Sequence, residues 1–119
     1  LDEPAAALDP KHTVIVNHIV EQLSAEGITV LMATHDVDYA MEWADEVMLL
    51  KDGQLLTHGT PEEVFSDQDS LALTNLKQPA VLQLFNSLCS RGLLDPSLPI
   101  PRNLEQLERY IAEIQPLPL

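Results

Sequence analysis

Three acidic side chains and one histidine carry the candidate chemistry near the start of this sequence. Asp2 and Glu3 follow Leu1, Asp9 comes shortly afterwards, and His35 stands behind an apolar stretch. An acidic pair at the end of an apolar strand can hold a magnesium ion and polarise a water molecule, while a later histidine can reach the terminal phosphate of a nucleotide. The pattern therefore points to the chemistry of nucleotide hydrolysis.

Each of these residues also fits a simpler structural explanation. Asp2 and Glu3, followed by Pro4, fit an acidic turn at the end of a strand. Asp9, directly before a proline, fits a helix N-cap whatever the function of the chain. An isolated histidine such as His35 is more often bonded to nearby backbone than placed in a site. It is the combination of these residues, in this order, that favours a functional site.

The elements expected after Asp9 place His35 at the edge of a sheet. Asp9 and Gly27 suit the two ends of a helix that the apolar spacing predicts over Pro10–Glu26. Ile28–Ala33 is apolar on both faces, which is typical of a buried strand in a parallel sheet. His35 then lies just past the carboxyl end of that strand, where open α/β sheets bind their ligands.

A short helix and a β-hairpin are expected next. Asp36 can cap a helix over Val37–Trp43. Two strands, Glu46–Leu50 and Gln54–His58, flank the dipeptide Asp52–Gly53. That dipeptide favours a tight turn with positive φ angles, so the two strands are predicted to pair antiparallel.

The composition changes near Asp67. Thr60 and Glu63 have capping-box spacing and predict a short helix that runs to about Phe65, followed by a polar linker over Ser66–Ser70. We therefore predict a first domain over residues 1–66 and a helical extension over residues 67–119. The extension is expected to contain a helix over Pro79–Arg91, a proline-rich loop over Asp95–Pro101 and a helix over Asn103–Ile114.

The bulk composition narrows the classes of partner. The chain has 119 residues, 45% of them hydrophobic, which suits a globular domain. A formal net charge of -13 argues against a nucleic-acid surface, since binding to phosphates needs clustered Lys and Arg. No apolar run is long enough to span a bilayer, so a membrane role would require a partner. Cys89 is the only cysteine and is predicted to serve packing.

Five motifs, in order and spacing, resemble the C-terminal half of an ABC transporter ATP-binding subunit. The resemblance covers roughly Leu1 to Asp67, and it implies an α/β fold: the C-terminal portion of a P-loop NTPase (ABC ATPase) fold, with an incomplete sheet, a β-hairpin and then a small α-helical extension. The motifs are Leu-Asp-Glu-Pro, Ala-Leu-Asp-Pro, Ala-Thr-His-Asp, Lys-Asp-Gly-Gln and Gly-Thr-Pro-Glu-Glu-Val-Phe.

The resemblance assigns a role to each candidate residue. Asp2 would end the Walker B strand, bind the nucleotide and support Mg²⁺ together with ATP. Glu3 would be the catalytic base that orients or deprotonates the attacking water. Asp9 would belong to the D-loop at the nucleotide site, and His35 would be the catalytic switch histidine that contacts the γ-phosphate.

The sequence also departs from the family pattern. Ala5 and Ala6 stand where Thr and Ser are usual in the family, and neither alanine has the hydroxyl group of the usual D-loop contact. The 119 residues contain no phosphate loop of the form Gly-x-x-x-x-Gly-Lys-Ser/Thr and no Leu-Ser-Gly-Gly-Gln signature. We therefore expect the chain to be the later part of a longer parent protein, inactive alone, with ATP and Mg²⁺ bound in the parent and neither bound to the isolated chain.

The second half of the chain resembles, more loosely, the ending of cobalt-type energy-coupling ATPases. This likeness rests on residues 73–79 and 84–88 and on a proline-rich loop before the Leu-Glu-Gln-Leu helix. It implies an ATPase that powers uptake of cobalt, nickel or a related cargo at the cytoplasmic face of the cell membrane. The implied partners are a second ATPase subunit and integral membrane transport subunits. The transported substrate stays open.

Two other readings compete with the transport ATPase. The first is a non-catalytic dimerisation or regulatory module, which the missing phosphate loop favours. The second is a non-transport ATPase of the same superfamily, against which the acidic charge and the energy-coupling-like ending count. Under any of these readings the isolated chain is expected to self-associate, because an apolar strand over Ile28–Ala33 needs neighbours on both sides.

Overall fold

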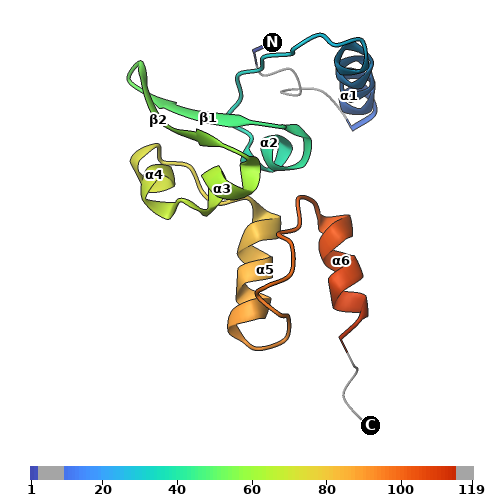
Figure 1. Cartoon of the computed structure of the whole chain (residues 1–119), viewed down its shortest axis with the longest axis vertical. Coiled ribbons are helices and arrows are strands. Elements are labelled where there is room, and N and C mark those ends of the chain that lie inside the picture. The colour runs from blue at the N-terminus through green and yellow to red at the C-terminus, as the bar shows by residue number, and fades with distance from the viewer. Residues whose placement is uncertain (3–9, 115–119) are drawn as a thin grey trace. The chain divides into compact units, whose positions relative to one another are not determined.

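The computed structural model of the chain describes residues 1–2 and 10–114 (Figure 1). Its contacts divide the chain into two compact units, Leu1–His35 and Asp36–Leu119. The first unit contains helix α1 (Pro10–Ala25), and the second contains all the other helices and both strands of the described residues.

Helix α1 has the predicted extent to within one residue at its end. Gly27 adopts a φ of 82°, and its N–H donates to the carbonyl of Ser24 at 3.0 Å. The N–H of Ile28 donates to the carbonyl of Leu23, also at 3.0 Å. This is the Schellman arrangement, in which a residue with positive φ closes the helix, and it confirms Gly27 as the terminator. The predicted cap, Asp9, lies outside the described residues.

The prediction of a buried strand over Ile28–Ala33 is wrong for this structure. Only an isolated parallel bridge, between Asp2 and Ala33, forms there, and the side chain of Leu31 is 70% exposed. A parallel strand needs backbone partners along its whole length. Among the described residues only Leu1 and Asp2 supply such a partner, so the segment remains extended without becoming a regular strand.

The predicted hairpin is confirmed. Strands β1 (Val47–Lys51) and β2 (Gln54–Gly59) pair antiparallel. Asp52 and Gly53 connect them with φ angles of 50° and 76°. Positive φ at both central residues matches the twist of the flanking strands, which is why an Asp-Gly dipeptide favours this turn.

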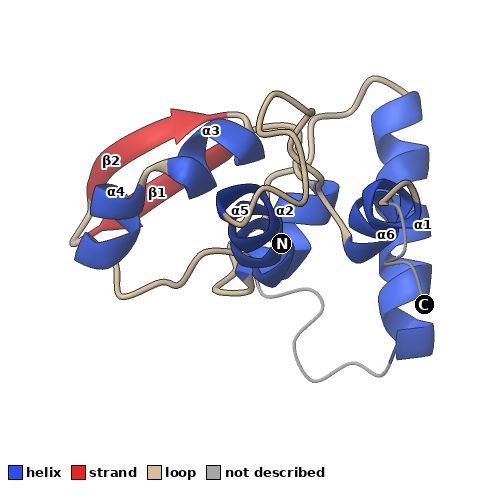
Figure 2. Cartoon of the chain, turned by 90° about the horizontal axis from the view of Figure 1, so that it is seen from below, coloured by secondary structure: helices blue, strands red, loops and turns tan. Residues whose placement is uncertain are grey.

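Helix α3 (Pro61–Ser66) begins at the predicted cap. The hydroxyl oxygen of Thr60 accepts a hydrogen bond from the N–H of Glu63 at 3.2 Å, and the same hydroxyl donates to the Glu63 carboxylate at 3.0 Å. The Glu63 side chain therefore bonds to the hydroxyl of Thr60. Helix α3 contacts both strands and lies alongside the hairpin in Figure 2.

Replacement of Thr60 tests the value of this cap. Thr60→Ala removes the acceptor for the first turn and is expected to lower the free energy of unfolding by about 1 kcal/mol. Thr60→Ser keeps the hydroxyl and is the matched control, with an expected change close to zero. Urea denaturation followed by circular dichroism measures both. An equal loss in the two variants would show that the methyl group matters and the hydrogen bonds do not.

The predicted polar linker over Ser66–Ser70 is wrong, because helix α4 (Gln68–Leu73) forms there. Asp67 caps this helix: its carboxylate accepts from the Ser70 hydroxyl at 2.7 Å and from the Ser70 N–H at 3.2 Å. These hydrogen bonds, the hydroxyl bond first, lower the pKa of Asp67. A short polar run can thus form a helix when its first residue caps it and Leu71 enters the core.

One hydrophobic core holds the second unit together. Helices α2 (Val37–Trp43), α5 (Ala80–Ser90) and α6 (Leu104–Ala112) contribute to it along with α3, α4 and β1. Cys89 packs against this core, as predicted. The core includes residues on both sides of Asp67. The division of the chain into a first domain over residues 1–66 and a helical extension over residues 67–119 stays a prediction. The buried members of the core are Met41, Leu49, Val64, Phe65, Leu71, Val81, Leu82, Phe85, Leu94 and Leu107.

Candidate functional site

Asp2 and the segment before His35 meet at one edge of the first unit. The N–H of Ala33 donates to the carbonyl of Leu1 at 2.6 Å, and the amino group of Leu1 donates to the carbonyl of Leu31, also at 2.6 Å. The two segments run parallel, with Asp2 opposite Ala33. Because parallel segments end at the same edge, the carboxylate of Asp2 and the residues leading to His35 share that edge.

This edge offers exposed polar groups rather than a closed metal cage. Asp2 and His35 are both exposed. No group of three or more His, Cys, Asp or Glu side chains that could hold a metal occurs within residues 1–2 and 10–114. Mg²⁺ in nucleotide sites usually takes one or two carboxylates and completes its shell with water and phosphate oxygens. A single carboxylate at an exposed edge fits that partial role.

Two of the predicted site residues cannot be placed. Glu3 and Asp9 lie outside the described residues. Their assignments as catalytic base and D-loop residue, like the switch role of His35, stay predictions. The structure thus brings together the segment that carries Asp2 and the segment that precedes His35, which is the part of the predicted site it describes.

The helix that follows His35 is anchored at its start and in its middle. Asp36 caps α2, with its carboxylate accepting from the N–H of Tyr39 at 3.0 Å. Burial, and secondarily the Asp36 carboxylate, raise the pKa of Tyr39. Met41 is fully buried in the core of the second unit. The structure confirms the predicted bounds of this helix, Val37–Trp43.

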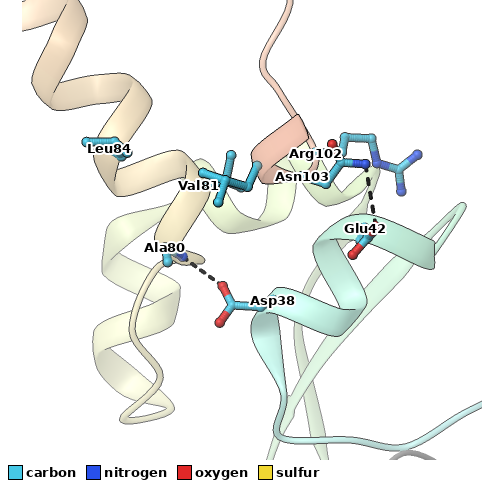
Figure 3. A pocket seen from close by; sticks show the side chains of 8 residues that line it. Asp38, Glu42, Ala80, Val81, Leu84, Arg102 and Asn103 are labelled. Atoms are coloured by element: carbon cyan, nitrogen blue, oxygen red, sulfur yellow. Dashed lines mark hydrogen bonds between the residues drawn. The ribbon is translucent and has the colours of Figure 1, made fainter. Parts of the chain in front are cut away.

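A shallow groove of about 290 Å³ lies between α2 and the helical extension (Figure 3). At one end of it the Asp38 carboxylate accepts a hydrogen bond from the N–H of Ala80, the first residue of α5, at 2.7 Å. The groove is lined by Asp38, Glu42, Ala80, Val81, Leu84, Arg102, Asn103 and Leu104.

Arg102 is the residue of this region that the sequence patterns missed. Its Nε donates to the carbonyl of Met41 at 2.8 Å, and its Nη2 donates to the carbonyl of Ala44. The same Nε lies 3.1 Å from a carboxylate oxygen of Glu62. The sequence feature that could have drawn attention to Arg102 is the scarcity of cations, because the chain has only six Lys and Arg residues and nineteen Asp and Glu residues.

The described residues include no helix with the length and apolar character needed to cross a membrane.

The exposed extended segment predicts self-association of the isolated chain. The side chains of Ile28 and Leu31 are exposed, and exposed apolar side chains on an extended segment promote association between chains. We expect sedimentation velocity at micromolar concentration to show dimers or larger species. Leu31→Lys places a charge on this segment and should shift the distribution toward monomer. A monodisperse monomer for the unmodified chain would contradict the prediction.

Comparison with known proteins identifies several relatives, although no protein-family model matches the sequence. An energy-coupling factor transporter ATP-binding protein of Methanospirillum hungatei is 38% identical over 111 residues, which cover 93% of this chain and 28% of the relative. A protein of the same description from Methanocaldococcus jannaschii is 41% identical over 88 residues, 74% of this chain and 32% of the relative. Another, from Mycoplasma pneumoniae, is 40% identical over 89% of this chain and 36% of its own length.

A solved structure is also similar. CbiO1 of Clostridium perfringens, described as part of the ABC transporter complex CbiONQ, shares 36% identity over 72% of this chain and 35% of its own, with a TM-score of 0.49.

The chain spans between about a fifth and two fifths of the length of the curated relatives it matches. The relatives and the observed β-hairpin confirm the predicted fold class, a part of the P-loop NTPase (ABC ATPase) fold with a helical extension. The chain is therefore homologous to part of the ATP-binding proteins of ABC transporters, and energy-coupling factor proteins are among its relatives.

Proposed function

We propose that the chain forms one edge of the ATP-hydrolysing site of an ATP-binding protein that powers an ABC importer. This edge is called the hydrolytic edge below. The longer ATP-binding protein of which the chain would be a segment is called the parent protein below. The observation that carries the proposal is the parallel bridge between Asp2 and Ala33, in a chain whose relatives are described as transporter ATP-binding proteins. That bridge places the acidic residue Asp2 opposite Ala33, shortly before His35 in the sequence.

Each candidate residue has one role in the proposal. Asp2 would support Mg²⁺, which supplies charge neutralisation on the phosphates when it is bound with ATP. Glu3 would accept the proton of the attacking water, as a general base within hydrogen-bond reach. His35 would contact the terminal phosphate and report its presence. Asp9 would contribute to the nucleotide site from the D-loop.

Partners follow from what the relatives are. The energy-coupling factor relatives are described as transporter ATP-binding proteins, and CbiO1 is described as part of a transporter complex. We therefore propose a second ATPase subunit and integral membrane transport subunits as partners of the parent. Its place would be the cytoplasmic face of the membrane, and its cargo cobalt, nickel or a related substrate of energy-coupling transporters.

Equilibrium titration with a fluorescent ATP analogue tests this proposal. The parent protein is expected to bind the analogue in a magnesium-dependent, saturable manner. The isolated 119 residues are expected to show no measurable binding, because they contain no phosphate loop to hold the triphosphate. A parent that fails to bind would overturn the ATPase proposal and favour a non-catalytic module. Tight binding by the isolated chain would show that its own residues suffice.

A further inference from the structure

The helix that follows His35 is held by the helical extension at both of its ends. Near the start of α2, the Asp38 carboxylate accepts from the N–H of Ala80 at 2.7 Å. Ala80 is the first residue of α5, so the carboxylate satisfies an N–H that has no partner within its own helix and lies at the positive end of that helix. Figure 3 shows this contact and the hydrogen bond between Asn103 and Glu42.

At the other end of α2, Arg102 occupies the position of a C-terminal cap. Its guanidinium donates from Nε to the Met41 carbonyl and from Nη2 to the Ala44 carbonyl. A cation at the carboxyl end of a helix also interacts favourably with the helix dipole. Beside it, Asn103 donates to the Glu42 carboxylate at 3.5 Å, a longer and weaker contact.

Arg102 also neutralises a carboxylate that has little other support. Oε1 of Glu62 is buried and has no hydrogen-bond partner of good geometry among the described residues, yet it lies 3.1 Å from Nε of Arg102. Both side chains are about 30% exposed, so solvent screens their attraction only in part. A single arginine thus connects the loop before α6, the end of α2 and the start of α3.

We propose that Arg102 and Asp38 are positioning residues. Through them the helical extension holds α2, the helix that follows the candidate switch histidine His35 of the ATPase. The inference rests on the proposed function, because it assigns His35 the role of phosphate sensor. The chain passes directly from His35 to Asp36, whose carboxylate caps α2. Movement of α2 therefore also moves the adjoining backbone, which carries His35. Arg102 acts on the reaction only through this helix and is not a catalytic residue.

Steady-state ATP hydrolysis by variants of the parent protein tests the inference. Arg102→Ala is expected to lower kcat about tenfold with little change in KM for ATP. The nucleotide is held by other segments, whereas misplacement of a contact to the reacting phosphate slows the chemical step. Arg102→Lys keeps the charge near Glu62 but loses the two-pronged contact with the carbonyls, so only part of the activity should return.

Two further substitutions separate positioning from simple destabilisation. Asp38→Ala should lower kcat, whereas Asp38→Asn keeps an oxygen acceptor for the Ala80 N–H and should retain most of the activity. Arg109→Ala is the matched arginine control: its contact with Glu105 is an exposed pair within α6, and kcat should not change. Hydrogen–deuterium exchange of the 119-residue chain should show faster exchange in α2 for Arg102→Ala and unchanged exchange for Arg109→Ala.

The outcomes distinguish a failure of the proposed function from a failure of the positioning role. An unmodified parent without ATPase activity would overturn the proposed function, and the exchange of α2 would then report only on structure. An active parent in which Arg102→Ala and Asp38→Ala leave kcat unchanged would overturn the positioning role alone. A fall in kcat that is equally large for Asp38→Ala and Asp38→Asn would also overturn it, because the retained acceptor would then not matter.

Discussion

Glu3→Gln in the parent protein is expected to preserve ATP binding and to lower turnover by a factor of about 10² to 10⁴, the usual range for loss of a general base. Glutamine keeps the size of the side chain and its oxygen, but its amide cannot accept the proton of the attacking water. Binding of a fluorescent ATP analogue and release of inorganic phosphate measure the two properties separately.

Glu105→Gln is the matched control for this substitution. Glu105 lies on α6 with an exposed side chain, so the same chemical change there should leave both properties intact. Undiminished hydrolysis in Glu3→Gln would remove Glu3 from the reaction and would point to another base. Loss of ATP binding in the same variant would assign Glu3 to the nucleotide site rather than to the water.

Leu107→Ala is expected to lower the free energy of unfolding of the 119-residue chain by about 2–5 kcal/mol, as for other buried leucines. The side chain of Leu107 is fully buried in the core shared by α6 and the hairpin-bearing part of the second unit. Its removal leaves a cavity among well-packed neighbours. Urea denaturation followed by circular dichroism measures the change.

Leu104→Ala on the same helix provides the comparison. Leu104 is 55% exposed, so the same substitution removes far fewer contacts and should cost well under half as much. Equal losses for the two variants would contradict the packing described for α6. A small loss in Leu107→Ala alone would mean that the extension does not share the core of the unit.

Helix α6 shows what the spacing of apolar residues predicts correctly and what it does not. Helical spacing places Leu104, Leu107, Ile111 and Ile114 on one apolar face, and Leu107 is indeed buried. The observed face runs through Leu107, Tyr110 and Ile114 instead, because the core includes the ring of Tyr110, which lies 6.2 Å from that of Phe85. Spacing alone cannot choose between two overlapping faces of one amphipathic helix.

Local chemistry predicted the turns and caps best. Asp52 and Gly53 specified a hairpin turn, Thr60 specified the start of α3, and Gly27 specified the end of α1. Each of these signals works through one or two backbone groups and does not depend on distant partners. The strand over Ile28–Ala33 failed for the opposite reason, since a parallel strand exists only when other segments pair with it.

The candidate site was predictable only where motifs carried it. Asp2 and His35 stood out by residue type and order, and the parallel bridge at Asp2 supports their placement on one edge. Arg102 belongs to none of these motifs, because its partners are main-chain carbonyls at the far end of α2, about sixty residues away in sequence. A contact of that range depends on how α2 and the extension pack together.

Release of inorganic phosphate from ATP, measured for the parent protein and for the isolated 119 residues in the presence of Mg²⁺, tests whether this chain is one part of an ATPase site. We predict magnesium-dependent hydrolysis by the parent and none by the isolated chain, because the chain would supply the hydrolytic edge and other segments would hold the nucleotide. A parent that releases no phosphate, or an isolated chain that hydrolyses ATP by itself, would contradict it.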